Sequence, residues 1–176
     1  MKTNIALVGF MGTGKTAVAA ILSERLNKEL VEIDSLIEFE AGKSIPDIFR
    51  DDGEIAFRDI EIEVTKRVAS GKNQVIACGG GIVLNKINID RLKEGAALVY
   101  LTASPAVILQ RVDTDNTARP LLAKGDKALV IREMLNFRQP FYERAADIIV
   151  DTSAIDIDTT AETIITRLRE YEGFDW

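Results

Sequence analysis

One stretch of the sequence has the residue types and the spacing of a phosphate-binding loop. Residues 9–16, GFMGTGKT, match the pattern G-x-x-x-x-G-K-[ST] and stand between an apolar run and a helix-forming segment. Glycines let such a loop fold around phosphate oxygens with its N–H groups pointing inward, at a helix start whose dipole favours anions. Lys15 can reach the β- and γ-phosphates, and the Thr16 hydroxyl can ligate Mg²⁺. We therefore predict that this loop (the P-loop) binds a nucleoside triphosphate.

Three consecutive glycines, Gly79, Gly80 and Gly81, directly follow the apolar run 75–78. Ligands of open parallel sheets bind beyond the carboxyl ends of the strands, where this cluster would lie. Glycine leaves backbone N–H groups uncovered, which suits close approach of a carboxylate or a phosphate. The residues alone allow a second interpretation equally well, namely a simple transition from strand to loop.

Asp34 stands at the end of a second apolar run, residues 30–33. A carboxylate at this edge of the sheet can accept a hydrogen bond from a substrate hydroxyl, orient it for in-line attack and take its proton. Taken alone, the residue fits better as the N-cap of a helix that begins at Ser35. Both interpretations stay open at this point.

Three arginines, Arg58, Arg119 and Arg138, are candidates for binding anions, although each alone also fits a solvated ion pair. Arg119 differs from the other two because it lies in residues 113–125, a polar segment with little periodicity. A loop of that length in a compact domain is usually functional or mobile. An arginine on a mobile lid that closes over the phosphates would stabilise charge in the transition state.

The composition narrows the possible chemistry. The 176-residue chain contains no histidine and a single cysteine, Cys78. Histidine-dependent triads, histidine metal sites, disulfide frameworks and thiolate zinc sites are therefore excluded, and acid–base work falls to carboxylates, Lys or Tyr. Cys78 lies in an apolar run, which favours core packing over a role as nucleophile.

The net charge of −6 argues against a general affinity for nucleic acid or for an anionic membrane. The sequence has no apolar stretch of transmembrane length and no signal-peptide pattern at its start. We therefore expect a cytoplasmic protein that binds neither nucleic acid nor a membrane.

Short apolar runs alternate with longer amphipathic segments and would position these residues. The runs predict five strands, at residues 5–8, 30–33, 75–78, 97–101 and 148–150. Their nearly continuous apolar character is typical of strands covered on both faces in a parallel sheet. The alternation predicts one domain, residues 1–176, with a doubly wound α/β fold in which helices flank a five-stranded parallel sheet.

Residue types also predict where two helices begin. Ser104 followed by Pro105 indicates a helix start, because Pro is favoured in the first turn. Thr159 with Glu162 three residues later fits a capping box before the last helix.

Taken together, these features resemble the shikimate kinase family, which belongs to the nucleoside-monophosphate-kinase-like group of P-loop proteins. The matching motifs, in order, are residues 9–16 (GFMGTGKT), 33–38 (IDSLIE), 42–49 (GKSIPDIF), 53–61 (GEIAFRDIE), 77–81 (ACGGG), 99–101 (VYL), 119–122 (RPLL), 138–142 (RQPFY) and 146–152 (ADIIVDT). Each motif apart from the P-loop is weak alone, but the set in this order and spacing is specific and covers nearly the whole chain.

The resemblance implies both a fold and a reaction. The fold is that of a P-loop NTPase with a mobile lid at about residues 112–125 and a shikimate-binding helical region at about residues 34–62. The reaction is phosphorylation of the 3-hydroxyl of shikimate by ATP, with Mg²⁺, on the route to chorismate and the aromatic amino acids. The expected partners are the two small-molecule substrates, and the expected state is a monomer.

The resemblance also implies roles for single residues. Asp34 would hold the ring hydroxyls and act as the base, while Arg58 and Arg138 would bind the substrate carboxylate with help from the backbone of the three glycines. Arg119 would close over the ATP phosphates and act in catalysis with Lys15. The residues implied for nucleotide binding are Gly12, Thr13, Gly14, Lys15, Thr16, Ala17, Arg111, which would lie against adenine, and Arg119. Thr16 and Glu32 would serve the metal.

The chain departs from the family pattern at three places. Glu32 stands where the family usually has Asp, Cys78 where Thr is common, and Ser153 close to where some members place an Arg near adenine. These departures concern the metal and the nucleotide rather than the shikimate-binding set. Two alternatives to a shikimate kinase are another small-molecule kinase of the same fold, similar to gluconate kinase, and a nucleotide-binding module without catalytic activity.

Overall fold

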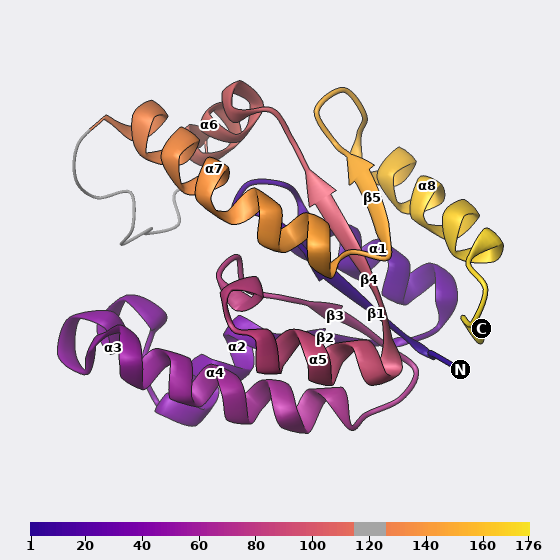
Figure 1. Cartoon of the computed structure of the whole chain (residues 1–176), viewed down its shortest axis with the longest axis horizontal. Helices are drawn as coiled ribbons and strands as arrows, with labels where there is room; N and C mark the ends of the chain where they lie inside the picture. The colour runs from indigo at the N-terminus through magenta and orange to yellow at the C-terminus, as the bar shows by residue number, and fades with distance from the viewer. Residues whose placement is uncertain (115–125) are drawn as a thin grey trace.

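The computed structural model describes residues 1–114 and 126–176 of the chain. Five strands form one parallel sheet in the order β2-β3-β1-β4-β5 (Figure 1). The strands are β1 (Asn4–Val8), β2 (Glu29–Glu32), β3 (Gln74–Ala77), β4 (Ala96–Thr102) and β5 (Ile148–Asp151). These bounds confirm the five predicted strands, each end to within one residue.

Helices connect successive strands and cover both faces of the sheet, which confirms the doubly wound architecture (Figure 1). In the described residues they are α1 (Lys15–Leu26), α2 (Ile33–Ala41), α3 (Ile45–Asp51), α4 (Gly53–Ala69), α5 (Lys86–Gly95), α6 (Pro105–Thr114), α7 (Lys127–Ala145) and α8 (Ile157–Glu170), with a 3-10 turn, η1 (Ile82–Leu84), after β3. None of these helices is long and apolar enough to cross a membrane.

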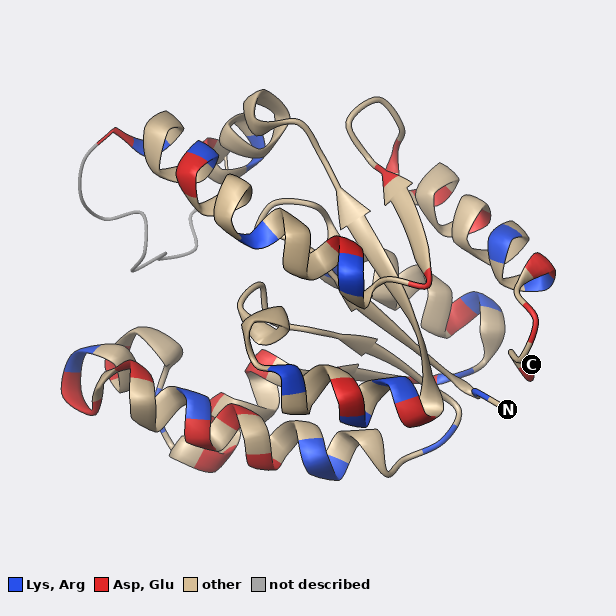
Figure 2. Cartoon of the chain, viewed as in Figure 1, with Lys and Arg blue, Asp and Glu red and all other residues tan. Residues whose placement is uncertain are grey.

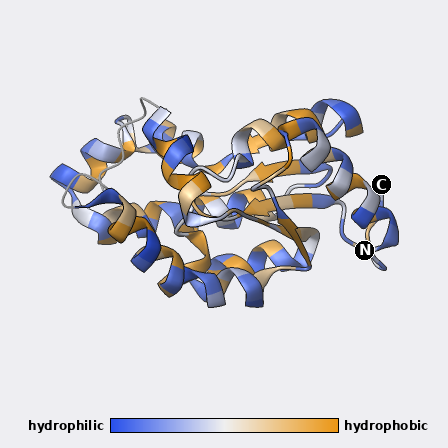
Figure 3. Ribbon diagram, turned by 90° about the horizontal axis from the view of Figure 1, so that it is seen from above, coloured by the Kyte–Doolittle hydropathy of each residue, from blue (hydrophilic) through white to orange (hydrophobic). Residues whose placement is uncertain are grey.

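The core has two parts because side chains alternate between the two faces of each strand. In β1, Ile5 and Leu7 pack with residues of α1 and α8, whereas Ala6 and Val8 pack with residues of α2, α4, α5, α6 and α7. Figure 3 shows the hydrophobic strands running between these two helical layers. The central strands β1, β3 and β4 contain no Lys, Arg, Asp or Glu, so the charges of Figure 2 lie mainly on helices.

The structure confirms one of the two predicted helix starts and contradicts the other. Helix α6 begins at Pro105 directly after Ser104, as predicted. The prediction of Thr159 as a cap was wrong, because α8 already begins at Ile157 and Asp156 is its N-cap. The Asp156 carboxylate accepts a hydrogen bond from the Thr159 backbone N–H at 2.7 Å, which places Thr159 inside the first turn.

Candidate functional site

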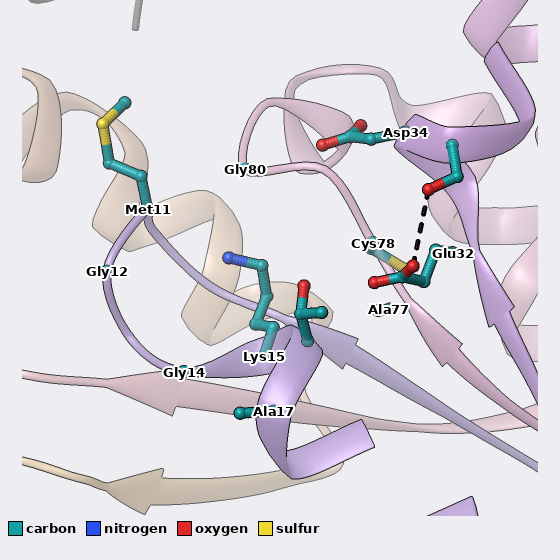
Figure 4. A pocket seen from close by; sticks show the side chains of 12 residues that line it. Met11, Gly12, Gly14, Lys15, Ala17, Glu32, Asp34, Ala77, Cys78 and Gly80 are labelled. Carbon is teal, nitrogen blue, oxygen red and sulfur yellow. Dashed lines mark hydrogen bonds between the residues drawn. The ribbon is translucent and has the colours of Figure 1, made fainter. Parts of the chain in front are cut away.

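A pocket of about 340 Å³ lies beyond the carboxyl ends of β1, β2 and β3 (Figure 4). Lys15 and Thr16 of the P-loop line one side of it. Glu32, the last residue of β2, Asp34, which follows β2, and Gly80, which follows β3, line the other. The sheet therefore brings together residues from three distant parts of the sequence, as expected for a ligand site at this edge of a parallel sheet.

The P-loop has the backbone geometry that its glycines predict. Gly12 and Gly14 adopt positive φ angles of 76° and 90°, a conformation that other residues rarely adopt, and α1 begins immediately afterwards at Lys15. The carbonyl of Phe10 accepts hydrogen bonds from the Lys15 ammonium at 2.9 Å and from the Thr13 hydroxyl at 2.8 Å. The Thr13 side chain is thus turned into the loop, and the residue is buried.

Thr16 and Ala17 are exposed residues in the first turn of α1, and both line the pocket. The N-terminus of this helix therefore opens onto the pocket, where the helix dipole favours an anion.

Arg111 lies behind the P-loop, at the end of α6. Its guanidinium donates to the Gly12 carbonyl at 3.2 Å, to the Thr152 hydroxyl at 3.0 Å and to the Thr152 carbonyl at 2.7 Å. These bonds tie α6 and the end of β5 to the phosphate-binding backbone. Arg119 and most of the predicted lid lie outside the described residues.

Asp34 lies in the first turn of α2, and the interpretation of this residue as an N-cap was wrong. The strand ends at Glu32, which takes the N-cap position, so that Ile33 and Asp34 already belong to the helix. The side chains of Asp34 and Glu32 both line the pocket (Figure 4).

The pocket walls around Asp34 raise the pKa of its carboxyl above the ordinary value of 3.8, because they remove much of the water that would solvate the charge. The positive charges of Lys15 and Arg58 lower this pKa, whereas Glu38 and Glu32 raise it further. Asp34 is thus a carboxylate with increased proton affinity near the positive charge of Lys15, which suits a base that takes a proton from a hydroxyl.

Arg58 is held in place on α4 by carboxylates of its own helix. Its Nη1 donates to both oxygens of Glu61 at 3.0 Å, and its Nη2 donates to Glu54 at 3.2 Å. The guanidinium also lies over the Phe57 ring, 5.0 Å from the centroid. The orientation of Arg58 is therefore fixed before any substrate arrives.

Glu61 is a site residue to which the sequence analysis gave no role. Its side chain is 1% exposed, and burial raises the pKa of its carboxyl, while the adjacent Arg58 lowers that pKa. The available signal was the spacing of Arg58 and Glu61, three residues apart on one helix face. Burial of the pair could not be deduced from that spacing.

Arg138 lies on α7 and is only 7% exposed. Its guanidinium carbon lies over the ring of Phe10, 5.7 Å from the ring centroid, and Phe10 is the second residue of the P-loop. A β-carbon at Gly80 would be 3.8 Å from the Arg138 Nη1 and 3.6 Å from the Met11 backbone nitrogen. Gly80 thus separates a buried arginine from the phosphate-binding loop.

The other two glycines lie close to Asp34 and Arg58, the other two residues predicted to bind the substrate. A β-carbon at Gly79 would lie 2.6 Å from Asp34 Oδ1, and one at Gly81 would lie 2.5 Å from Arg58 Nη2. Any side chain at these positions would displace Asp34 or Arg58. Within the glycine triplet (Gly79, Gly80 and Gly81), Gly79 and Gly81 therefore make room for two charged side chains, which goes beyond the predicted approach of a ligand to the backbone.

The chemistry of two residues suits a magnesium ion. Thr16 and Glu32 both line the pocket, and the Glu32 carboxylate accepts a hydrogen bond from the Ser35 hydroxyl at 3.4 Å. The described residues contain no cluster of three His, Cys, Asp or Glu side chains that could hold a metal. A hydroxyl and one carboxylate fit Mg²⁺, which usually keeps several waters and binds through few protein oxygens together with substrate phosphates.

Cys78 is 3% exposed and belongs to the core, and burial raises the pKa of its thiol. It was expected to pack rather than react, and this prediction is confirmed. Its position at the floor of the pocket follows from its place between β3 and the glycine triplet.

Comparison with known proteins was made for the sequence and for the fold. The family model described as shikimate kinase matches residues 11–169. Shikimate kinases from Pelotomaculum thermopropionicum and Thermodesulfovibrio yellowstonii are 44% and 43% identical to the chain, and each match covers 96% of this chain and at least 95% of the relative.

Among solved structures, a shikimate kinase from Acinetobacter baumannii in complex with shikimate superposes with a TM-score of 0.91 at 34% identity. That match covers 98% of this chain and 96% of the other. A shikimate kinase from Aquifex aeolicus gives a TM-score of 0.81 at 32% identity over 94% of this chain and 96% of the other.

Proposed function

Because the chain belongs to the shikimate kinase family, and thus catalyses ATP-dependent phosphorylation of shikimate, we propose that the pocket at the carboxyl ends of β1, β2 and β3 is where the transfer occurs. The observation that carries this proposal is the glycine triplet, against which one carboxylate and two guanidinium groups are packed beside the P-loop. The comparisons favour neither a gluconate-kinase-like enzyme nor an inactive nucleotide-binding module.

Shikimate is a small carboxylate with several ring hydroxyls. Its carboxylate needs cationic hydrogen-bond donors, whereas the hydroxyl that is phosphorylated needs an acceptor for its proton. Arg58 and Arg138 bind the carboxylate through charge-assisted hydrogen bonds, with the backbone N–H groups of the triplet as further donors. The pairing of Arg58 with buried Glu61 supports this role, because a fixed guanidinium loses little conformational entropy on binding. The helical region at about residues 34–62 supplies Asp34 and Arg58 to this half of the site.

Asp34 accepts a hydrogen bond from the 3-hydroxyl and orients its oxygen toward the γ-phosphate. As the phosphate transfers, the carboxylate takes the hydroxyl proton, and the raised pKa of Asp34 favours that step. Lys15 and the N–H groups of the P-loop stabilise the charge on the transferring phosphate. The missing histidine is no obstacle, since phosphoryl transfer depends mainly on positioning and charge neutralisation.

The triphosphate lies in the P-loop, on the backbone from Gly12 to Ala17. Mg²⁺ would be held by Thr16 and, directly or through water, by Glu32, and when bound it neutralises phosphate charge. Arg111 supports the nucleotide half by fixing Gly12 and Thr152, and it can also lie against the adenine. Arg119, which lies outside the described residues, acts on the ATP phosphates in this proposal, as the family resemblance implies.

The remaining properties that we propose concern the protein in the cell. The chain acts as one catalytic domain, a monomer in the cytoplasm, with shikimate and ATP as partners and without binding to nucleic acid or membranes. The net charge of −6 supports this, because an acidic protein repels the phosphates of nucleic acid and of anionic lipids.

The division of the site into two halves can be tested by steady-state kinetics. Arg58→Ala removes a charged partner of the carboxylate and should raise the KM for shikimate at least about 30-fold, or about 2 kcal/mol, with little change in the KM for ATP. Lys15→Ala should instead impair catalysis with ATP at any shikimate concentration. If Arg58→Ala leaves the affinity for shikimate unchanged, Arg58 does not belong to the acceptor half.

A further inference from the structure

Tyr142 contacts the glycine triplet from another element of the fold. Its hydroxyl donates a hydrogen bond of 2.5 Å to the Gly80 carbonyl. Tyr142 lies on α7, is 0% exposed, and its ring stacks on that of Tyr100 with centroids 4.9 Å apart. A stacked and fully buried ring leaves the hydroxyl little freedom, so the Gly80 carbonyl is held from a fixed point.

The carbonyls of the other two glycines are held differently. The Gly79 carbonyl accepts from the Ile82 backbone N–H at 3.2 Å, and the Gly81 carbonyl accepts from the Leu84 N–H at 3.1 Å. Both bonds belong to the local turn η1 and the residues that flank it. The bond to Gly80 is the one that connects the triplet to α7, which also carries Arg138.

This bond has a consequence for the backbone donors of the triplet. In a trans peptide the N–H points away from the C=O of the same unit, so fixing the Gly80 carbonyl also fixes the direction of the Gly81 N–H. Glycine imposes little restriction of its own, and a peptide between two glycines can rotate at low cost. A side chain that holds the carbonyl therefore selects one orientation of that peptide.

The Tyr142 hydroxyl also lies beside the side chain of Arg138, a residue one helical turn before Tyr142 on α7. Burial raises the pKa of the Tyr142 hydroxyl, while the positive charge of Arg138 lowers it. The hydroxyl consequently stays protonated near neutral pH and can act as a donor to Gly80. Tyr142 thus touches both groups to which acceptor recognition was assigned, the triplet backbone and the buried arginine.

We propose that Tyr142 is a positioning residue for acceptor recognition, whose hydroxyl orients the Gly80–Gly81 peptide so that its N–H and the Arg138 guanidinium meet the same acceptor carboxylate. The inference rests on the proposed function, because it assigns the carboxylate of shikimate to this corner of the pocket. Tyr142 acts through Gly80 and takes no part in proton or phosphate transfer.

The test is Tyr142→Phe, which keeps the buried, stacked ring and removes the hydroxyl alone. The matched control is Tyr100→Phe, the same change in the ring that stacks on Tyr142, because the Tyr100 hydroxyl is hydrogen-bonded to Thr102. Each variant and the wild type are assayed with shikimate and with its methyl ester, at a temperature where circular dichroism shows all three proteins folded. Loss of one neutral hydrogen bond predicts a KM for shikimate that rises about 3- to 10-fold in Tyr142→Phe.

The proposal further requires that the KM for ATP stays constant, that the penalty shrinks with the methyl ester, and that Tyr100→Phe leaves the KM for shikimate unchanged. An unchanged KM for shikimate in Tyr142→Phe overturns the inference, as does an equal penalty for the acid and its ester or an equal effect of Tyr100→Phe. A wild-type protein inactive on shikimate overturns the proposed function instead, so the two failures can be distinguished.

Discussion

Asp34 combines exposure to the pocket with a raised proton affinity, and its replacement tests its role as base and orienter. Asp34→Asn keeps the size and a hydrogen-bonding oxygen but cannot take a proton. We expect turnover to fall by at least about 100-fold, the range in which acid–base catalysis contributes, while ATP binding persists. Asp59→Asn, at an exposed carboxylate on α4, is the matched control and should have near-normal turnover. Near-normal turnover of Asp34→Asn would show that Asp34 is neither the base nor an essential orienter.

The raised pKa of Asp34 also predicts a pH dependence. The carboxylate must be deprotonated to act as base, so kcat/KM should fall as the pH falls through its pKa. Because enclosure in the pocket raises that pKa above 3.8, the acidic limb of the profile should lie above pH 3.8, where an unperturbed Asp is already more than half ionised. A profile of kcat/KM against pH, measured over the range in which protein and substrate are stable, checks this. An acidic limb at or below pH 3.8 would contradict the assignment of Asp34 as the base.

At the scale of elements, the glycine triplet connects β3 to three charged side chains. Gly79→Ala would bring a β-carbon to 2.6 Å from Asp34 Oδ1, so the carboxylate must move out of its position. We expect a large loss of kcat, because misplacement of a catalytic group by about 1 Å can cost about 100-fold. Gly95→Ala is the control, since the nearest atom to its β-carbon would be 3.6 Å away. Equal activity of the two variants would show that Gly79 does not set the position of Asp34.

The start of α8 provides a prediction about stability alone. Asp156→Ala removes the N-cap and should lower the free energy of unfolding by about 1 kcal/mol, without changing either KM. Thr159→Ala removes the residue that the sequence pattern favoured as the cap and should have a smaller effect. Thermal unfolding of both variants checks the assignment, and a larger loss for Thr159→Ala would reverse it.

Across the whole molecule, the sequence allowed the layers to be predicted because strands buried on both faces must be nearly continuously apolar. The bounds of β1 and β3 followed directly from such runs. The lateral order β2-β3-β1-β4-β5 did not follow, since no local pattern states which strands pair. The position of a candidate site residue was predictable where the residue lies next to a strand end, as Asp34 does. Glu61 was not, because its role depends on burial against helices far away in the sequence.

The strand order explains how one chain assembles both halves of the site. Strand β1, which precedes the P-loop, pairs with β3, which precedes the glycine triplet, and β3 pairs with β2. The residues proposed to bind the nucleotide and those proposed to bind the acceptor are therefore neighbours at one sheet edge. Helix α7 adds Arg138 and Tyr142 from the other side of the triplet. Lys15 lines the pocket, and Arg58 and Arg138 lie against the glycine triplet, so these three cations are the local attraction for two anionic substrates.

The most direct measurement is an acceptor screen in which ADP release is followed with ATP and Mg²⁺ and with shikimate, quinate, gluconate or nucleoside monophosphates. We predict rapid turnover with shikimate alone and a product phosphorylated at the 3-hydroxyl, as identified by NMR. Absence of turnover with shikimate, or faster turnover with gluconate or a nucleoside monophosphate, would contradict the assignment of Asp34, Arg58 and Arg138 to shikimate.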